Sequence, residues 1–330
     1  MVVHHASFWS DNLPKIEQTL GAIAIFFAVL GAIFYLAGKV NGRAARPLAS
    51  LIFLGPALLL LLVGLIVPAA KTILFSFKDA YSMKYVGFKN YKWIIQDPEI
   101  HKVIWNTLIW ILVTPFATTA LGLLLAIMLN RMKRESLPKS LLFMPMAISF
   151  VGASIIWQFV YNYAPEGQPQ TGLLSAIART LGFTPPNWIL SQPLNTFLLM
   201  VIFVWVETGF AMVILSAAIK GVPDDIMEAS ALDGATGWKL FRGITFPMVR
   251  GTFIVVFATM VVTSLKLFDI VRTVTGGNFG TSVISNEMYS QIFVRFNTGR
   301  GSALAVILFI LVTPILVYNI RNLRRERSIS

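Results

Sequence analysis

The stretch Asn195–Ala217 reads NTFLLMVIFVWVETGFAMVILSA and contains one charged residue, Glu207. The hydrocarbon core of a membrane is about 30 Å thick, and a helix that rises about 1.5 Å per residue crosses it in about 20 apolar residues. This stretch is therefore expected to be a transmembrane helix. Six further blocks have the same character: Leu20–Gly38, Leu48–Ala70, Val103–Leu129, Leu141–Val160, Thr252–Val271 and Ser302–Ile320. The sequence thus predicts an all-α polytopic membrane protein with about seven transmembrane helices.

The composition agrees with a membrane protein. Of 330 residues, 56% are hydrophobic and 13% are charged, about half the roughly 25% charged residues of an ordinary soluble domain. This composition excludes a disordered chain, and the lack of cysteine excludes a disulfide scaffold or a thiolate metal site. The net charge of +12 comes without a dense Lys/Arg stripe, which favours cytoplasmic membrane loops over nucleic-acid binding.

The first apolar block could be mistaken for a cleaved signal sequence. The preceding segment Met1–Ile16 carries Asp11 and the single basic residue Lys15, and no small-residue cleavage site precedes the next block. We therefore expect Leu20–Gly38 to be an additional amino-terminal transmembrane helix. On this basis residues 1–47 form that helix with a cytoplasmic linker, and residues 48–330 form the main transmembrane domain.

Lys and Arg are distributed unequally between the two sets of loops. Fifteen lie in the loops around residues 39–47, 130–140 and 219–251 and in the tail after Ile320, and ten lie in the loops on the other side. Because cytoplasmic loops carry the basic excess, we expect the carboxyl terminus inside and the amino terminus on the periplasmic side of a bacterial inner membrane.

Residues for bond chemistry are scarce. The three histidines, His4, His5 and His101, do not have metal-ligand spacing, and His4-His5 is expected to be an exposed terminal pair. The chain has no Gly-x-x-x-x-Gly-Lys-[Ser/Thr] phosphate loop and no Gly-x-Ser-x-Gly motif. We expect no catalysis, no metal site and no cofactor bound by this chain.

The loop Ile219–Gly251 is predicted to form an elbow of two short helices. Pro223 suits a first helical position, and Gly234 supplies the left-handed residue that ends the first helix. Thr236 can cap a second helix that Pro247 is expected to stop. Such an elbow can dock another protein through small residues, or it can lie on lipid headgroups, and physical reasoning leaves both open. The small residues in question are Ala229, Ser230, Ala231 and Ala235.

At this point the residues resemble a known family. The pattern Glu228-Ala229-Ser230, Gly234 and Ile244-Thr245-Phe246-Pro247 resembles the EAA loop of ABC importer permeases. The longer stretch Glu228–Ala235, followed by Phe241 and Ile244, is similar to the carbohydrate-uptake branch; Ser230 and Phe246 replace the usual Ala and Leu. The resemblance covers about Leu51–Arg325 and includes Asn106-Thr107-Leu108, Gly172-Leu173-Leu174 and Lys266-Leu267-Phe268-Asp269 with Thr275-Gly276-Gly277. Within the branch, Tyr161–Trp188 and Asn278-Phe279-Gly280, which lacks the usual Pro, look most like the α-glucoside (trehalose, maltose, sucrose) group.

The resemblance implies a transport subunit with several partners. It implies a six-helix core with one additional amino-terminal helix, a second homologous permease and an extracytoplasmic sugar-binding protein. ATP and Mg would be bound by two separate ATP-binding subunits that dock on residues 219–251. We hypothesise that Glu228, Ala229, Asp233 and Gly234 form the seat, although Gly234 could matter for folding alone. The implied coupling-loop set is Glu228, Ala229, Ser230, Asp233, Gly234, Ala235, Phe241, Ile244 and Pro247.

Ionisable residues inside a membrane span cost at least ~2.5 kcal/mol and need a reason. Lys266 and Asp269 are expected three residues apart on one helical face, and Glu207 is expected to pair with a base on a neighbouring helix. The alternative is a hydrophilic pathway for a polyol. By resemblance to the fifth and sixth spans of related importers, and from the polar and aromatic chemistry, the pathway candidates are Trp205, Glu207, Thr208, Phe210, Ser264, Leu267 and Phe268.

Three other functions remain open from the sequence. A secondary transporter could couple sugar to a proton through Glu207 and Asp269, but that function leaves the elbow unexplained. An ABC permease could carry a phosphodiester or an amino acid instead of a sugar. A membrane-embedded enzyme is disfavoured by the lack of paired histidines or clustered acids.

Overall fold

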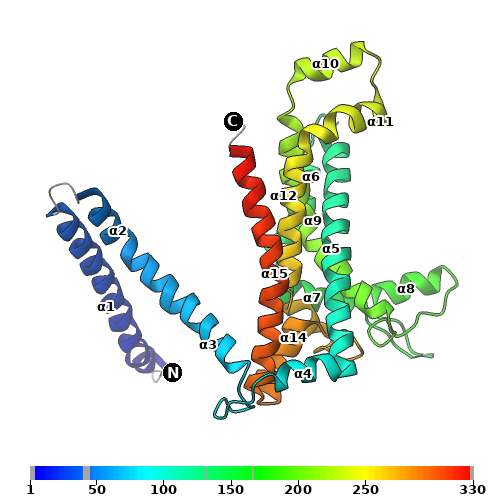
Figure 1. The fold of residues 1–330 in the computed structure, drawn as a ribbon. Helices are drawn as coiled ribbons and strands as arrows, with labels where there is room; N and C mark the ends of the chain where they lie inside the picture. The colour runs from blue at the N-terminus through cyan, green and yellow to red at the C-terminus, as the bar shows by residue number, and fades with distance from the viewer. Residues whose placement is uncertain (1–3, 40–44, 131, 166, 328–330) are drawn as a thin grey trace. The chain divides into compact units, whose positions relative to one another are not determined.

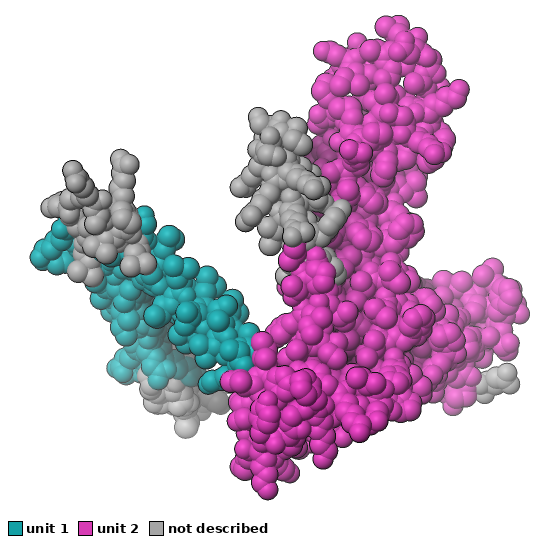
Figure 2. Space-filling view, in the orientation of Figure 1, with its two compact units in different colours: residues 1–71 teal, residues 72–330 magenta. Residues whose placement is uncertain are grey.

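The computed structural model describes the chain except residues 1–3, 40–44, 131, 166 and 328–330 (Figure 1). Within the described part the regular structure is helical, with one isolated β-bridge between Lys78 and Tyr85. The expected all-α fold is confirmed. The chain divides into two compact units, residues 1–71 and 72–330 (Figure 2). The expected domain boundary after residue 47 stays a prediction.

The first unit contains α1 (His4–Gly38), α2 (Ala45–Leu61), the π-helical turn η1 (Leu62–Ile66) and the start of α3 (Val67–Phe75). Phe34 of α1 packs edge-on against Phe53 of α2, with ring centroids 5.5 Å apart. Both helices expose apolar side chains along their length, as expected of helices that face lipid. The first two predicted spans are therefore present, as the apolar stretches Glu17–Tyr35 and Ile52–Phe75.

Three long helices form the centre of the second unit: α5 (Pro98–Asn130), α9 (Leu194–Lys220) and α12 (Phe246–Leu265). They pack side by side because each is apolar over nearly its whole circumference (Figure 1). Trp110 of α5 and Phe203 of α9 are fully buried and meet edge to face at 6.3 Å. Four shorter elements gather at one end of these long helices: α4 (Lys89–Gln96), α13 (Asp269–Val274), α14 (Ile284–Tyr289) and η4 (Ser290–Val294).

The predicted span Leu141–Val160 is not one continuous helix. The structure has α6 (Ser136–Phe143), a 3₁₀ turn η2 (Met144–Ala147) and α7 (Phe150–Val160), and the two arms are bent by 102°. Pro145 lies in the 3₁₀ turn, and Ser149 is extended, with φ −63° and ψ 153°. The Ser149 hydroxyl accepts a hydrogen bond from the Gly152 N–H at 3.1 Å and so caps a new helix. A proline and an N-cap serine therefore break an apolar run that hydropathy alone reads as continuous.

The predicted span Thr252–Val271 is also broken. Helix α12 ends at Leu265, and α13 begins at Asp269, so Lys266 and Asp269 do not lie on one helical face. Among the described residues these two side chains form no ion pair with each other, contrary to the expected neutralisation. The short connection Lys266–Phe268 separates them.

The expected count of seven spans is not confirmed. In the described part, five helices are long and apolar enough to cross a membrane, and the bent α6–α7 pair gives a sixth if it counts as one span. The seventh predicted span falls in α15 (Thr298–Arg327), whose described apolar stretch, Thr298–Pro314, is shorter. The segment after α7 contains α8 (Leu173–Thr180). Arg43, Arg131 and the side chains of His4 and His5 lie outside the described residues.

Candidate functional site

The elbow begins with α10 (Asp224–Leu232), which stands clear of the long helices of its unit (Figure 1). The Pro223 carbonyl accepts hydrogen bonds from the N–H groups of Ile226 and Met227, at 3.2 and 3.4 Å. Asp224 and Asp225 occupy the first turn, where the helix dipole favours negative charge. The first arm of the elbow therefore starts one residue later than predicted, with Pro223 at the cap position and Asp224 as the first helical residue.

Gly234 ends this arm as predicted. Its φ is +77°, in the left-handed region. The N–H of Ala235 donates to the Ser230 carbonyl at 2.9 Å, and the N–H of Asp233 donates to the Ala229 carbonyl at 3.1 Å. The bond from Ala235 to Ser230, which spans the left-handed Gly234, is the six-to-one bond of the Schellman motif. It satisfies one of the last carbonyls of the helix.

The second arm differs from the prediction. Helix α11 (Gly237–Leu240) continues through the π turn η3 (Phe241–Thr245) into α12, so Pro247 does not stop a helix. A proline inside a helix removes one hydrogen-bond donor. Here the π turn changes the hydrogen-bond register just before Pro247, with the Phe246 N–H bonded to the Phe241 carbonyl. Thr236 does occupy the N-cap position, but its side chain makes no capping bond.

The nine coupling-loop candidates fall into two groups. Ser230 is buried and its hydroxyl donates to the Ile226 carbonyl at 2.6 Å, so it does not add to a small-residue surface. Phe241 packs toward α5 and contacts the rings of Trp238 and Phe246 at 5.2 and 5.9 Å. Ile244 and Ala235 are half-buried, and the exposed candidates are Glu228, Ala229, Asp233, Gly234 and Pro247. The side chain of Ala231 lies outside the described residues.

The elbow also exposes two large apolar side chains that the candidate set omits. Leu232 is 90% exposed and Trp238 is 69% exposed. Trp238 and Phe241 border an apolar groove of about 700 Å³ against Leu123 and Leu124 of α5. Single exposed apolar side chains are common on protein surfaces, so these two do not by themselves define a contact surface.

Four of the seven pathway candidates lie on α9. Thr208 is buried, and its hydroxyl donates to the Val204 carbonyl at 2.5 Å. Trp205 is half-buried and meets Trp157 edge to face at 5.8 Å, and Phe210 packs against the same apolar core. Glu207 is half-buried and forms no hydrogen bond or ion pair with any described residue, so the expected basic partner is absent there.

The other three candidates lie at the end of α12 and in the connection after it. Ser264 is buried, and its hydroxyl accepts from that of Thr114 on α5 at 3.0 Å. Leu267 is buried in the same core as Trp205 and Phe210. Phe268 packs against Tyr289 at 5.0 Å. Thus three of the seven, Thr208, Ser264 and Leu267, are packed inside this chain, and the pathway role of the set stays a prediction.

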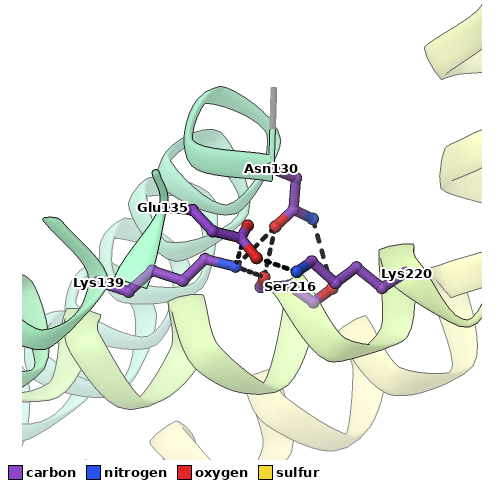
Figure 3. Close-up of polar contacts among 5 residues, drawn as sticks. All are labelled: Asn130, Glu135, Lys139, Ser216 and Lys220. Atoms are coloured by element: carbon purple, nitrogen blue, oxygen red, sulfur yellow. Dashed lines mark hydrogen bonds and ion pairs between the residues drawn. The ribbon is translucent and has the colours of Figure 1, made fainter. Parts of the chain in front are cut away.

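A polar cluster that the sequence reasoning missed lies where α5, α6 and α9 meet (Figure 3). We call it the polar clamp; its members are Asn130, Glu135, Lys139, Ser216 and Lys220. The carboxylate of Glu135 pairs with Lys139 at 2.8 Å and with Lys220. The hydrogen bond from Lys139 and then that from Lys220 hold the pKa of the Glu135 carboxyl below its usual value. The four-residue spacing of Glu135 and Lys139 is a sequence signal, but Ser216 and Lys220 are more than 75 residues away.

Comparisons with known proteins identify the family of this chain and its relatives. Residues 118–326 match the family described as binding-protein-dependent transport system inner membrane component. The chain is 46% identical to the osmoprotective compounds uptake permease protein GgtC of Synechocystis, over 84% of this chain and 99% of that protein. It is 42% identical to the alpha-glucoside transport system permease protein AglF of Rhizobium meliloti, over 99% of this chain and 95% of that protein.

A solved structure shares the fold. A chain of a bacterial alginate ABC transporter in complex with an alginate pentasaccharide-bound periplasmic protein superposes with a TM-score of 0.74 at 20% identity, over 86% of this chain and 96% of that one. The family match covers more than half of the chain, and the two relatives span 84% and 99% of it. The chain therefore belongs to the binding-protein-dependent inner membrane component family and is a sugar ABC transporter permease, a multi-pass transport component rather than an enzyme.

Proposed function

We propose that this chain forms half of the transmembrane pathway of an ATP-driven importer for an α-glucoside or a related oligosaccharide. The observation that carries the substrate class is the 42% identity to an α-glucoside permease over 99% of the chain. This identity to the α-glucoside permease extends over both the membrane helices and the outer segments. It therefore includes the parts of the chain that a sugar must pass. The substrate would be handed to the pathway by an extracytoplasmic sugar-binding protein.

ATP hydrolysis belongs in this proposal to two separate ATP-binding subunits, which hold ATP and Mg and dock on residues 219–251. The arrangement of α10 supports such docking, because the helix stands clear of the bundle and exposes Glu228, Ala229 and Leu232. A second homologous permease completes the pathway. The chain itself then binds no cofactor, and it transmits movement from the elbow to the membrane helices.

We place the elbow and the carboxyl terminus in the cytoplasm of a bacterial cell and the amino terminus in the periplasm. Contacts of the polar clamp bring the connection at residues 130–139 and the end of α9 to the same end of the second unit. These are two of the segments in which the sequence concentrates Lys and Arg, as cytoplasmic loops do.

A second candidate substrate class is favoured by a specific observation. The 46% identity to a permease for osmoprotective compounds supports an osmoprotective sugar compound in place of an oligosaccharide. Both candidates share the ATP-driven mechanism, so they differ in the substrate alone.

The test begins with purification of the chain from its native membranes in mild detergent and a count of its companions by mass spectrometry. We expect two ATPase copies and one homologous permease. The assembled complex, with its binding protein, is then placed in vesicles and offered labelled maltose, trehalose, sucrose and glycine betaine. Uptake of an α-glucoside that needs ATP and survives collapse of the proton gradient supports the proposal.

Other outcomes contradict it. Uptake of glycine betaine alone contradicts a sugar substrate of either kind. A homogeneous species of this chain without an ATPase, with uptake that stops when the proton gradient collapses, favours the proton-coupled transporter. Vesicles without the binding protein serve as the control, because a binding-protein-dependent importer should show almost no uptake there.

A further inference from the structure

The inner part of the polar clamp is a closed hydrogen-bonded ring (Figure 3). The ammonium of Lys139 donates to Asn130 Oδ1 and to Glu135 Oε2, each at 2.8 Å, and also to the Ser216 hydroxyl. An ammonium has three donors, so this set uses all of them. Ser216 donates in turn to Asn130 Oδ1 at 2.6 Å. The ring therefore fixes the ends of α5, α6 and α9 to one another.

The outer part of the clamp connects this ring to the base of the elbow. Glu135 Oε1 pairs with Lys220, while its other oxygen holds Lys139. Lys220 is the last residue of α9, and α10 begins at Asp224. One carboxylate in the α5–α6 connection thus joins α6 to the residue from which the elbow starts.

Close backbone packing continues the link along α6. A Cβ built on Gly209 of α9 would collide with the Leu142 carbonyl and would lie 2.7 Å from Phe143 Cα. The backbone of α6 therefore lies directly on α9 near Gly209, two turns before Ser216. Helix α6 is attached to α9 by backbone packing at Gly209, by the hydrogen bond from Lys139 to Ser216, and by the ion pair of Glu135 with Lys220.

The outer pair is poorly suited to stabilise the fold. The Lys220 side chain is 52% exposed, and exposed ion pairs contribute little to stability. Two lysines face one carboxylate, so the pair does not neutralise the cluster. Lys133 lies in the same connection and is exposed, and it forms no ion pair with a described residue. A charged residue in this connection is therefore not enough to form an ion pair with α9.

We propose that Glu135 is a positioning residue that transmits displacement of the elbow to α6 through Lys220 and Lys139. In this mechanism α6 moves together with α9 when the elbow moves, and without Glu135 the direct link from Lys220 to α6 is lost, so less of the movement reaches α6. The inference rests on the proposed function, since it concerns how ATP-driven movement reaches the membrane helices.

The test uses the complete importer in vesicles, with its partner permease, ATPases and binding protein. Sugar transported and ATP hydrolysed are measured in the same vesicles. We expect Glu135→Gln and Lys220→Gln to keep ATP hydrolysis and to lower sugar moved per ATP by roughly threefold or more, a modest effect of the size expected for one partly exposed ion pair. Lys220→Arg should keep the wild-type ratio because it restores the charge-assisted bond, and Lys133→Gln is the matched control that should also keep it.

Lys220 lies inside the proposed docking segment, so a loss there could reflect weaker ATPase binding. The double variant Glu135→Gln/Lys220→Gln separates the two causes. If both residues act through one bond, the double variant should be no worse than either single variant. Additive losses would overturn the proposed mechanism.

A covalent link provides an independent test, because the chain has no cysteine of its own. Glu135→Cys/Lys220→Cys should transport poorly until a short bifunctional thiol reagent joins the two positions, and the ratio should then recover. Wild-type ratios in Glu135→Gln and Lys220→Gln, or no recovery on linking, would overturn the inference.

If Glu135→Gln fails to assemble, the comparison of Lys220→Gln with Lys220→Arg decides. Failure of the proposed function is distinct, because the wild-type complex itself would then not couple ATP hydrolysis to uptake.

Discussion

Gly234 has a backbone conformation that favours glycine, but this chain leaves room for a larger side chain there. Its backbone is left-handed, yet a Cβ built on it would meet no atom of this chain within 4 Å. A left-handed backbone costs most side chains about 1–2 kcal/mol, whereas asparagine adopts it more readily. The chain therefore needs the backbone angle at this position, and any need for a small residue must come from a partner.

The first prediction concerns Gly234→Asn and Gly234→Val. Asparagine adds bulk with little strain, while valine adds both, so we expect both variants to lose ATP-driven uptake and only Gly234→Val to lower the melting temperature of the purified chain. The measurements are uptake in vesicles and thermal unfolding. If Gly234→Asn transports normally, Gly234 serves folding alone, and normal transport by Gly234→Val would remove it from the docking seat.

The second prediction concerns Glu207, a half-buried acid without a described partner. A carboxylate that faces the pathway can accept hydrogen bonds from sugar hydroxyls, and its amide is a weaker acceptor. We expect Glu207→Gln to reduce uptake of the transported sugar while assembly with the ATPases is unchanged. Initial uptake rates across sugar concentrations test this, and normal rates with every sugar in the panel would take Glu207 off the pathway.

At the scale of elements, two helix breaks decide which side chains meet. The bend at Pro145 and Ser149 turns α7 away from α6, and the break after Leu265 separates Lys266 from Asp269. Both breaks lie in apolar runs, where hydropathy carries no information about direction. Pro145 was visible in the sequence, but a proline in a membrane helix often causes only a kink, so its presence did not require a bend of 102°.

The third prediction tests the packing of α6 on α9. Gly209→Ala places a methyl group against backbone atoms of Leu142 and Phe143, which cannot rotate away. We expect a loss of about 1–3 kcal/mol in stability, as for overpacking of a tight core, read as a lower melting temperature. Gly31→Ala is the control, since nothing lies within 4 Å of its added methyl and helix propensity favours the change. Equal melting temperatures of Gly209→Ala and wild type would contradict the close approach.

At the scale of the whole molecule, the sequence predicted the class of fold and the family. It did not predict the contacts between segments that are distant in the chain. Long apolar runs such as Asn195–Ala217 map directly onto helices because a membrane span must satisfy its own backbone. The Gly234 turn followed from local chemistry in the same way. The polar clamp could not be predicted, because it joins residues 130–139 to residues 216–220 and depends on tertiary packing.

The fourth prediction concerns orientation. Single cysteines are introduced by Thr184→Cys in the segment after α8 and by Thr236→Cys in the elbow, both at exposed positions of a chain without native cysteine. A membrane-impermeant maleimide added to cells with a permeabilised outer membrane should label the first variant and not the second. Breaking the inner membrane should expose Thr236→Cys to the reagent. The reverse labelling would invert the proposed topology.

The π turn at Phe241–Thr245 gives the elbow a further property. A π turn holds one more residue than the α-helical turn it replaces, and each residue of an α-helix corresponds to about 100° of rotation and 1.5 Å of rise. Transfer of that surplus residue toward Gly237 would swivel the α11 arm by about 100° around the α12 axis and leave the helix unbroken. Such a transfer would change which face of the elbow is presented, through a shift of one residue at the base of the arm.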